Sequence, residues 1–346
     1  MAYLSLMDSA RRMDPDGEIA DIAELLSQAN EFFKDIIWRE SNLPTGHKST
    51  VRTGLPVGTW RAAYGGIPFT KSTTAQVEDG VGVLTALSQV DKMVAELNGK
   101  VAEIRMSEDN AHLEALSQQM ATAFFYGNAL TNPSQFTGFG PRYNSSITGG
   151  AANAQNVLDC GGSGSANLSI WLIGWGDETN FGIFPKGTKA GLVFEDRGDI
   201  QMGIDANSNW FPAYTSYFEW RSGLVTKDWR FAVRMADIDT TTTPLGLQGT
   251  TPPDLFYYMS KAVVRFPTLT KRASGITETD APDEPAPGIN PAFYCNRTGR
   301  EFLDIQAIRD KNVLLKPTEY AGEPVVEFRG IPIRVNDTLT NTEATV

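Results

Sequence analysis

The chain has 346 residues, of which 41% are hydrophobic and 21% charged, a composition typical of a folded protein with one large domain or two. Its 41 acidic and 30 basic residues give a formal net charge of −11, which argues against a protein that coats itself with nucleic acid. No run approaches 18 apolar residues, so no transmembrane helix is predicted. The apolar run at the N-terminus is too short for a signal peptide.

The first 44 residues are predicted to form an arm followed by a helix. Residues 1–17 show no periodic pattern, whereas apolar residues recur at helical spacing from Glu18 to Trp38. Pro44 prevents this helix from continuing.

Residues 45–78 change in character, because Gly, Pro, Thr and Ser become dense and β-branched residues alternate with polar ones. This pattern predicts an extended two-stranded hairpin that turns at Gly54–Gly58 or at Gly65–Gly66. Few of its residues could build a core, so such a hairpin needs a partner to lie on. The alternative is a long surface loop of a monomeric enzyme.

Two helices are predicted next, one over Val81–Leu97 and a longer one over Lys100–Gly127. The longer helix would span roughly 39 Å at about 1.5 Å per residue, which suits an element that sets the axis of a domain. Its expected apolar stripe consists of Ala102, Met106, Leu113, Leu116, Met120 and Phe124.

The second half is predicted to be rich in strands. Ser169–Trp175 is a continuous apolar run that suits a strand buried on both faces. In a strand over Leu224–Met235, Trp229, Phe231, Val233 and Met235 would share one face, and Arg230, Ala232 and Arg234 the other. The other predicted elements are strands at Gly191–Phe194 and Phe293–Cys295, helices at Pro253–Phe266 and Glu301–Lys311, a mobile loop over 271–291, and a closing hairpin of Val325–Phe328 and Ile331–Val335 that turns at Arg329-Gly330.

Motifs for chemistry are scarce, and we predict no catalytic, cofactor-binding or metal-binding residue. His47 and His112 are not spaced as a metal pair, and Cys160-Gly-Gly-Ser-Gly164 lacks the Lys-Ser/Thr of a phosphate-binding loop. Cys160 and Cys295 are expected to be free thiols, with a disulfide as the alternative. Seven tryptophans and the carboxylate pairs Asp177-Glu178, Glu195-Asp196 and Asp237 with Asp239 keep a sugar-acting enzyme or a lectin open as an alternative.

The order of the predicted pieces resembles the major capsid proteins of tailed double-stranded-DNA bacteriophages, which have the Hong Kong 97 fold. The similarity covers roughly residues 20–346 and depends on the order of its motifs more than on any single one. The motifs are Gln76–Gly80 (QVEDG), Val90-Asp91, Glu103–Arg105, Glu108, Phe125–Asn128 (FYGN), Gln135–Gly138 (QFTG), Arg142–Asn144 (RYN), Trp229–Arg234 (WRFAVR), Tyr294–Thr298 (YCNRT), and Phe328–Arg334 (FRGIPIR) with Asp337.

The resemblance implies an α+β fold with five parts. These are an N-terminal arm with a helix (1–44), an extended loop (45–78), a peripheral domain (79–150) with a spine helix at about 100–127, a mainly axial domain (151–315) whose strand at about 224–235 is shared with the peripheral domain, and a peripheral closing hairpin and tail (316–346).

The resemblance also implies a shell subunit of the virion that is assembled in the host cytoplasm. Copies would form the pentamers and hexamers of an icosahedral head, contact neighbouring capsomers, and enclose double-stranded DNA without sequence-specific binding or a membrane. An encapsulin-like compartment with a protein cargo is the alternative within the same fold. The residues expected at contacts between subunits lie in the extended loop and are Arg52, Trp60, Arg61, Tyr64, Phe69 and Lys71.

Two departures from relatives bear on assembly. Only about 40 residues precede the extended loop, so a separate scaffolding protein, or none, is expected, together with a portal and a decoration protein. Some relatives join their subunits by Lys–Asn isopeptide bonds. Lys48 or Lys71 with Asn336 or Asn341 would be the candidates here, although loop lysines are common without such bonds.

Overall fold

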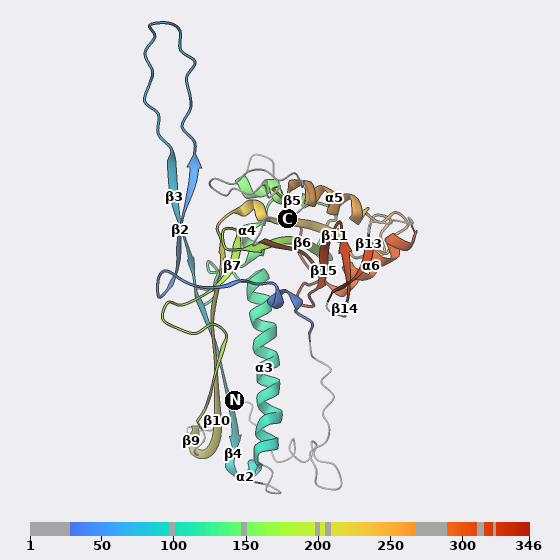
Figure 1. Ribbon diagram of the computed structural model, residues 1–346. Helices are drawn as coiled ribbons and strands as arrows, with labels where there is room; N and C mark the ends of the chain where they lie inside the picture. The colour runs from blue at the N-terminus through green and yellow to red at the C-terminus, as the bar shows by residue number, and fades with distance from the viewer. Residues whose placement is uncertain are drawn as a thin grey trace.

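The protein has a mixed α+β fold, as expected, in which a broad body continues into a long helix-and-strand extension and a thin hairpin projects at the opposite end (Figure 1). The computed structural model describes residues 28–96, 101–146, 151–197, 201–204, 209–267, 289–309, 315–320 and 323–346.

Strand β6 (Asn167–Gly176) is the centre of the body and is buried over its whole length. Because side chains alternate along a strand, those of Leu168, Ile170 and Leu172 enter a core beneath helices α5 (Leu255–Arg265) and α6 (Arg297–Arg309). The side chains of Trp171, Ile173 and Trp175, on the other face, enter a core shared with the long helix α3 (Val101–Tyr126). The predicted strand with two buried faces is therefore confirmed.

The largest sheet spreads from β6 in several directions. Antiparallel β11 (Ala232–Asp239) and β12 (Ile289–Cys295) flank β6. β5 (Val157–Asp159) pairs in parallel with β11, and β12 leads to β15 (Ile331–Val335), β14 (Glu323–Phe328) and β13 (Leu315–Tyr320). Near Trp175, β6 also meets β7 (Asn180–Phe184), which pairs with β1 (Trp38–Glu40) and with the end of β10 (Trp210–Thr226).

The long extension consists of β10 and the helix that covers it. β10 pairs with β4 (Gly82–Asp91) on one edge and with β8 (Leu192–Asp196) and β9 (Gln201–Ile204) on the other. Helix α3 (Val101–Tyr126) lies along β4 and β10, and the short α2 (Lys92–Ala95) closes the far end (Figure 1).

The helix predicted over Val81–Leu97 is wrong, because most of this segment is strand β4. Ten consecutive residues of β4 pair with Ala213–Ser222 of β10. Leu84 and Val90 are buried or half-buried on the side of α3, whereas Leu87 is exposed on the opposite face. A spacing of three residues is typical of a helix, but the pairing with the distant β10 overrides this local pattern.

The single strand predicted over Leu224–Met235 is also wrong. β10 ends at Thr226, a 3₁₀ turn (η4) occupies Trp229–Phe231, and β11 begins at Ala232. The carboxylate of Asp228 accepts a hydrogen bond from the backbone of Arg230 and caps this turn, a conformation that aspartate favours. From Phe231 onward the predicted alternation holds, since Phe231, Val233 and Met235 share one core.

The helix predicted over Glu18–Trp38 falls partly outside the described residues, which begin at Gln28. In the described part it is wrong, because only a 3₁₀ turn (η1) forms at Glu31–Lys34, followed by β1. Phe32 is fully buried against Phe124 and Phe125 of α3. This aromatic packing and the pairing of β1 with β7 hold the segment in place of a helix.

The long helix is confirmed as α3, but its predicted stripe is correct only in the second half. Leu116, Met120 and Phe124 are buried. Near the start of the helix Ile104 is buried and Met106 is 64% exposed, because Ile104 is the residue that packs with Val90 of β4 and Ala95 of α2.

Most of the remaining elements match their predictions. Helices α5 and α6 correspond to the predicted helices. β8 covers Leu192–Phe194 of the predicted strand at Gly191–Phe194, and β12 contains the predicted Phe293–Cys295. The closing hairpin turns at Arg329-Gly330, where both residues have positive φ. Residues 271–288 of the predicted mobile loop lie outside the described part, while 289–291 belong to β12. The sequence did not predict β1, β5, β7, β9, β13, the first part of β10, α4 (Phe139–Arg142) or η3 (Ala152–Asn156).

The last eleven residues, 336–346, form a strap across the body that we call the C-terminal strap. The side chain of Glu343, in its middle, is buried and accepts hydrogen bonds from Tyr126 of α3, Ser169 of β6 and Arg234 of β11. Arg234 and Glu343 form an ion pair of 2.8 Å with both side chains at most 7% exposed. One carboxylate thus joins the end of the long helix to two strands of the main sheet.

Substituting Gly138 by alanine should destabilise the end of α3. An added Cβ would lie 2.5 Å from the carbonyl oxygen of Phe124 and 2.6 Å from that of Ala123, and backbone atoms of a helix cannot move aside cheaply. We expect a loss of about 1–3 kcal/mol in unfolding free energy, measured by denaturant unfolding. Gly66→Ala is the control, because a Cβ there meets nothing within 4 Å; equal effects of the two substitutions would contradict the steric argument.

Truncating Glu343 to alanine should be costly, because Arg234 would remain buried without its partner. Breaking a buried pair from one side costs about 3–5 kcal/mol, and denaturant unfolding of the purified protein measures it. The matched control is Asp304→Ala, which removes the half-exposed partner of Arg300 on α6 and should cost under about 1 kcal/mol. A loss for Glu343→Ala no larger than the control would show that the C-terminal strap does not hold the body together.

Candidate functional site

The predicted extended hairpin is confirmed and stands apart from the rest of the molecule. β2 (Gly46–Gly54) and β3 (Thr73–Gly80) form a separate two-stranded sheet. We call residues 55–72 between them the hairpin tip. The tip turns at Ala63-Tyr64, where the amide of Gly65 donates to the carbonyl of Ala62 over 3.0 Å, next to the second of the two predicted turn positions.

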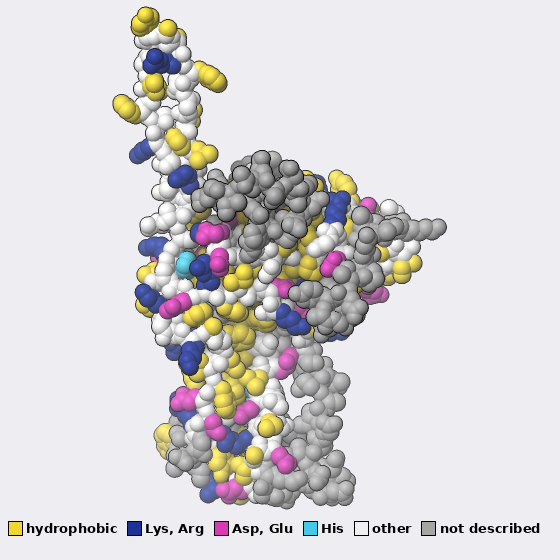
Figure 2. All heavy atoms as spheres, viewed as in Figure 1, with side chains coloured by type: hydrophobic (Ala, Val, Ile, Leu, Met, Phe, Trp, Pro, Cys, Tyr) yellow, Lys and Arg dark blue, Asp and Glu magenta, His cyan; other side chains and the backbone are white. Residues whose placement is uncertain are grey.

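The hairpin tip exposes an unusual set of large apolar side chains, which stand out along the upper end of the molecule (Figure 2). Trp60, Tyr64 and Phe69 are 102%, 103% and 106% exposed, and Leu55, Val57 and Ile67 are each more than 60% exposed. A soluble protein rarely leaves such a set uncovered, so the tip has the composition of a binding surface.

The same region carries basic charge only. Arg52, Arg61 and Lys71 are the charged residues between Ser49 and Val77, and there is no Asp or Glu among them. All three are exposed, Arg52 on β2 and the other two in the hairpin tip. The structure thus brings the six predicted contact residues together on one hairpin. Their contact with another subunit stays a prediction.

A buried ion pair anchors the base of the hairpin to the body. Arg142 of α4 donates to the carboxylate of Asp79 over 2.7 Å, and the Asp79 side chain is 5% exposed. The same guanidinium donates to the carbonyls of Thr137 and Leu224 over 3.1 and 3.2 Å. This pair spans 63 residues of sequence, and no local pattern pointed to it.

His47 lies at the same base, on β2 opposite Asp79. Its ring makes an edge contact with Phe181, with the centroids 5.5 Å apart. Burial lowers the pKa of His47, and Arg39 and Lys227 lower it further, while Asp79 acts in the opposite direction. Folding of the hairpin base therefore favours the neutral form of the His47 side chain.

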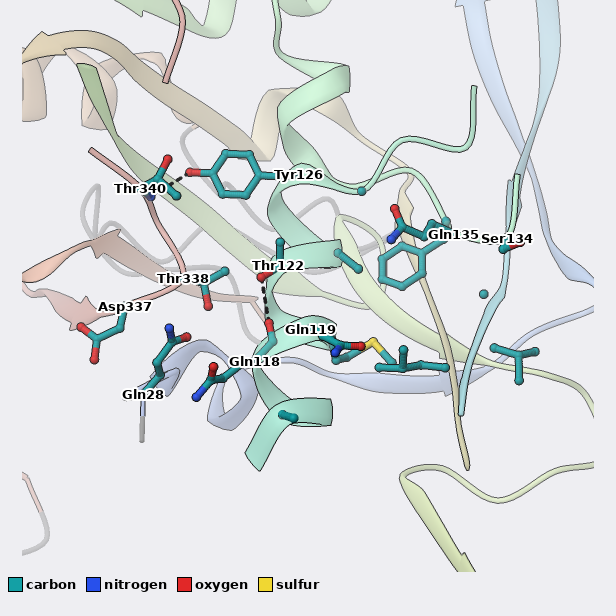
Figure 3. Close-up of a pocket in the computed structure, with 18 residues that line it drawn as sticks. Gln28, Gln118, Gln119, Thr122, Tyr126, Ser134, Gln135, Asp337, Thr338 and Thr340 are labelled. Carbon is teal, nitrogen blue, oxygen red and sulfur yellow. Dashed lines mark hydrogen bonds between the residues drawn. The ribbon is translucent and has the colours of Figure 1, made fainter. Parts of the chain in front are cut away.

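A pocket with a volume of about 630 Å³ runs along α3 (Figure 3). Its labelled polar residues are mainly neutral amides and hydroxyls, and the amide of Thr340 donates to the Tyr126 hydroxyl over 3.2 Å. Asp337 is the one acidic residue in its lining, and it is already held by two hydrogen bonds from Arg297. Among the lining residues there is no nucleophile paired with a base.

Most of the tryptophans and carboxylates that suggested a sugar-acting enzyme or a lectin have structural contacts. Trp171 and Trp175 are core residues of β6. The carboxylates of Asp177, Glu178 and Asp196 form ion pairs with Arg39, Lys227 and Arg105, respectively. Asp237 is buried, and its carboxylate accepts from the amide of Val346 at the end of the C-terminal strap.

The two histidines and the two cysteines also have structural surroundings: the histidine rings pack on aromatic rings, and the cysteines are buried. His112 stacks on Phe218 with the ring centroids 6.4 Å apart. Both cysteines are free, as expected. Burial raises the pKa of Cys295 to about 12 and that of Cys160 further still, so neither is a reactive thiolate. Within the described ranges no cluster of metal ligands occurs, and no helix there is long and apolar enough to cross a membrane.

The residues named for isopeptide bonds differ in their availability. Lys71 is exposed, and Lys48 pairs with Glu78 across the hairpin over 3.7 Å. Asn336 is fully buried, whereas Asn341 is exposed and donates to the hydroxyl of Thr298. Of the two asparagines, only Asn341 has a side chain that a neighbouring molecule could reach.

The chain matches the family model of major capsid protein GP7 over residues 14–346. It is similar over its whole length to a chain in the near-atomic-resolution structure of bacteriophage Epsilon15, with 30% identity, a TM-score of 0.73 and 98% of that chain covered. No curated protein matches.

Two weaker likenesses cover about two thirds of the chain. The capsid of the native GTA particle has 11% identity and a TM-score of 0.43, with 68% of this chain and 99% of that chain covered. The holo-SrpI encapsulin complex of Synechococcus elongatus PCC 7942 has 8% identity and a TM-score of 0.40, with 70% and 98% covered. With TM-scores below 0.5, neither supports a conclusion about this chain.

Lowering the pH from 7.5 to 5.5 should loosen the base of the hairpin. The unfolded chain binds a proton on His47 near pH 6.5, while the folded state resists it because its pKa is lower. The open state therefore binds more protons, and stability falls as the pH drops through this range. Relative to the intrinsic exchange rate at each pH, hydrogen exchange of the β2 and β3 amides should become faster, so their protection factors should fall. His47→Gln, which stays neutral, should remove most of this pH dependence; an unchanged profile would contradict the role of His47.

Proposed function

The chain belongs to the family of major capsid protein GP7, and from this premise we propose that its β2–β3 hairpin joins each subunit to a neighbour in the shell. The protein is a structural shell subunit of a bacteriophage virion and assembles with copies of itself. The observation that supports the proposal is the hairpin tip, whose large apolar side chains are exposed and pack on none of the described part of the chain.

The physical reason is that a two-stranded ribbon without a core is not stable by itself. Both of its edges present unpaired backbone groups, and its side chains would gain free energy by leaving water, at roughly 25 cal/mol per Å² of apolar area. A neighbouring subunit supplies the missing surface. In a closed shell each copy both gives and receives such a contact, so modest interfaces are multiplied by closure.

The finer picture of the head is part of the proposal. Subunits form pentamers and hexamers of an icosahedral head that encloses double-stranded DNA, and they assemble in the host cytoplasm. A portal, a separate scaffolding protein and a decoration protein are the expected further partners. The net charge of −11 supports a shell wall that does not bind packed DNA tightly.

The absence of enzymatic activity is likewise proposed, and the engaged carboxylates and buried tryptophans support it. The division into peripheral and axial domains also stays a proposal. The strand pairings add detail to it, since β8, β9 and most of β10 pair beside β4 along α3, while β15 pairs with β12 in the body.

Replacing residues 56–71 by a two-residue Asn-Gly turn should leave the subunit folded and reduce shell yield at least tenfold. The strands β2 and β3 remain, and Asn-Gly favours the tight turn they then need. Electron microscopy and sedimentation velocity measure the yield, and circular dichroism checks the fold. The control is Leu130→Ala, which removes another exposed apolar side chain, 93% exposed, outside the hairpin. Normal shells from the shortened hairpin would refute the proposed role.

A further inference from the structure

A second hollow, which we call the α3–β8 groove, lies on the uncovered flank of α3. It has a volume of about 430 Å³ and is lined by Ala102, Arg105, Met106, Asp109 and Leu113 of α3, Leu192, Phe194 and Asp196 of β8, and Phe218 of β10. Phe218 is buried at its floor and packs on Phe194 with the ring centroids 5.2 Å apart. Met106 and Phe194 are 64% and 53% exposed. The groove is therefore apolar and open.

The rim of the groove carries more negative than positive charge. Asp109 accepts a hydrogen bond from Ser216, and Arg105 pairs with Asp196 and lies over the ring of Tyr214. The charge of Arg105, the one guanidinium in the lining, is thus balanced by Asp196. Asp109 adds a second carboxylate to the lining.

The hairpin tip has the complementary properties. It presents Trp60, Tyr64 and Phe69 with full exposure, and its charged residues, Arg61 and Lys71, are basic. An apolar and basic ribbon suits an apolar hollow with an acidic rim, because apolar area is buried while opposite charges stay close at the edge.

The tip cannot occupy the groove of its own chain. Figure 1 shows the hairpin tip at one end of the molecule, and the start of α3, beside α2 and β9, at the other. The occupant must therefore be the tip of a second copy. We propose that the α3–β8 groove receives the hairpin tip of another subunit of the same protein, an inference that rests on the proposed role of the hairpin.

A charge-swap experiment in the full-length protein tests this inference. Met106→Lys places a cation in the groove, where it would repel Arg61, and shell yield should fall at least tenfold while thermal unfolding of the subunit stays unchanged, since Met106 is exposed. The second change Arg61→Glu, which supplies an opposite charge, should restore at least half of the yield. The control is Leu130→Lys at a position outside the groove, where Leu130 is 93% exposed against 64% for Met106, and this variant should assemble normally.

The outcomes separate this inference from the function on which it rests. If shortening the hairpin abolishes shells but Met106→Lys assembles normally, the hairpin has another receptor and the inference is overturned. If Met106→Lys fails and Arg61→Glu gives no rescue, the groove matters for another contact and the pairing is also overturned. If the variant with the shortened hairpin forms normal shells, the proposed function of the hairpin is wrong, and the inference that rests on it is wrong as well.

Site-directed crosslinking gives a second test that does not depend on yield. Ala62→Cys in the tip and Ala102→Cys in the groove should be joined between subunits by a short thiol-specific crosslinker in assembled shells, giving a ladder on denaturing gels. The two native cysteines are buried and should not react. Ala62→Cys with Ile308→Cys, 80% exposed on α6, is the control. Equal ladders from both pairs, or none from the first, would contradict the proposal.

Discussion

The burial of both faces of β6 is the constraint on which the body depends. A strand with apolar side chains on both sides is stable only if each face is covered, and here two different cores meet it. One core is completed by α5 and α6, and the other by the aromatic end of α3 together with Phe32. The long helix is thus held at its C-terminal end, while its first half extends away along β4 and β10. The shape of the molecule follows from this one-sided attachment.

The molecule combines firm anchoring with surfaces left uncovered. At the hairpin base, the carboxylate of Asp79 and the guanidinium of Arg142 are buried together, which fixes the direction of the ribbon. The hairpin tip and the flank of α3 around Met106, in contrast, keep apolar side chains in water. A monomeric protein would gain by covering them. In the proposed shell these are the areas for neighbouring subunits to cover.

Local patterns predicted the elements whose stability is largely local or whose apolar character is continuous. The long helix, β6, the extended hairpin, α5 and the closing hairpin are of this kind. β4 was mistaken for a helix, because Leu84, Leu87 and Val90 recur at helical spacing, whereas its strand state depends on β10, more than 120 residues later in the chain. The same holds for the anchor between Asp79 and Arg142. The composition of the tip was visible in the sequence, whereas the groove on α3 needs the positions of β8 and β10.

The C-terminal strap also determines when the subunit can be complete. Asn336 forms a bridge with Asn30, and Glu343 pairs with Asn167 and enters the core between α3 and β11. Translation runs from the N-terminus, and Glu343 lies 109 residues after Arg234. Ribosomes add roughly 5–20 residues per second, so Arg234 is without its buried partner for on the order of 5–20 seconds. The strands of the body that are made first can therefore close around this guanidinium only after synthesis has passed Glu343.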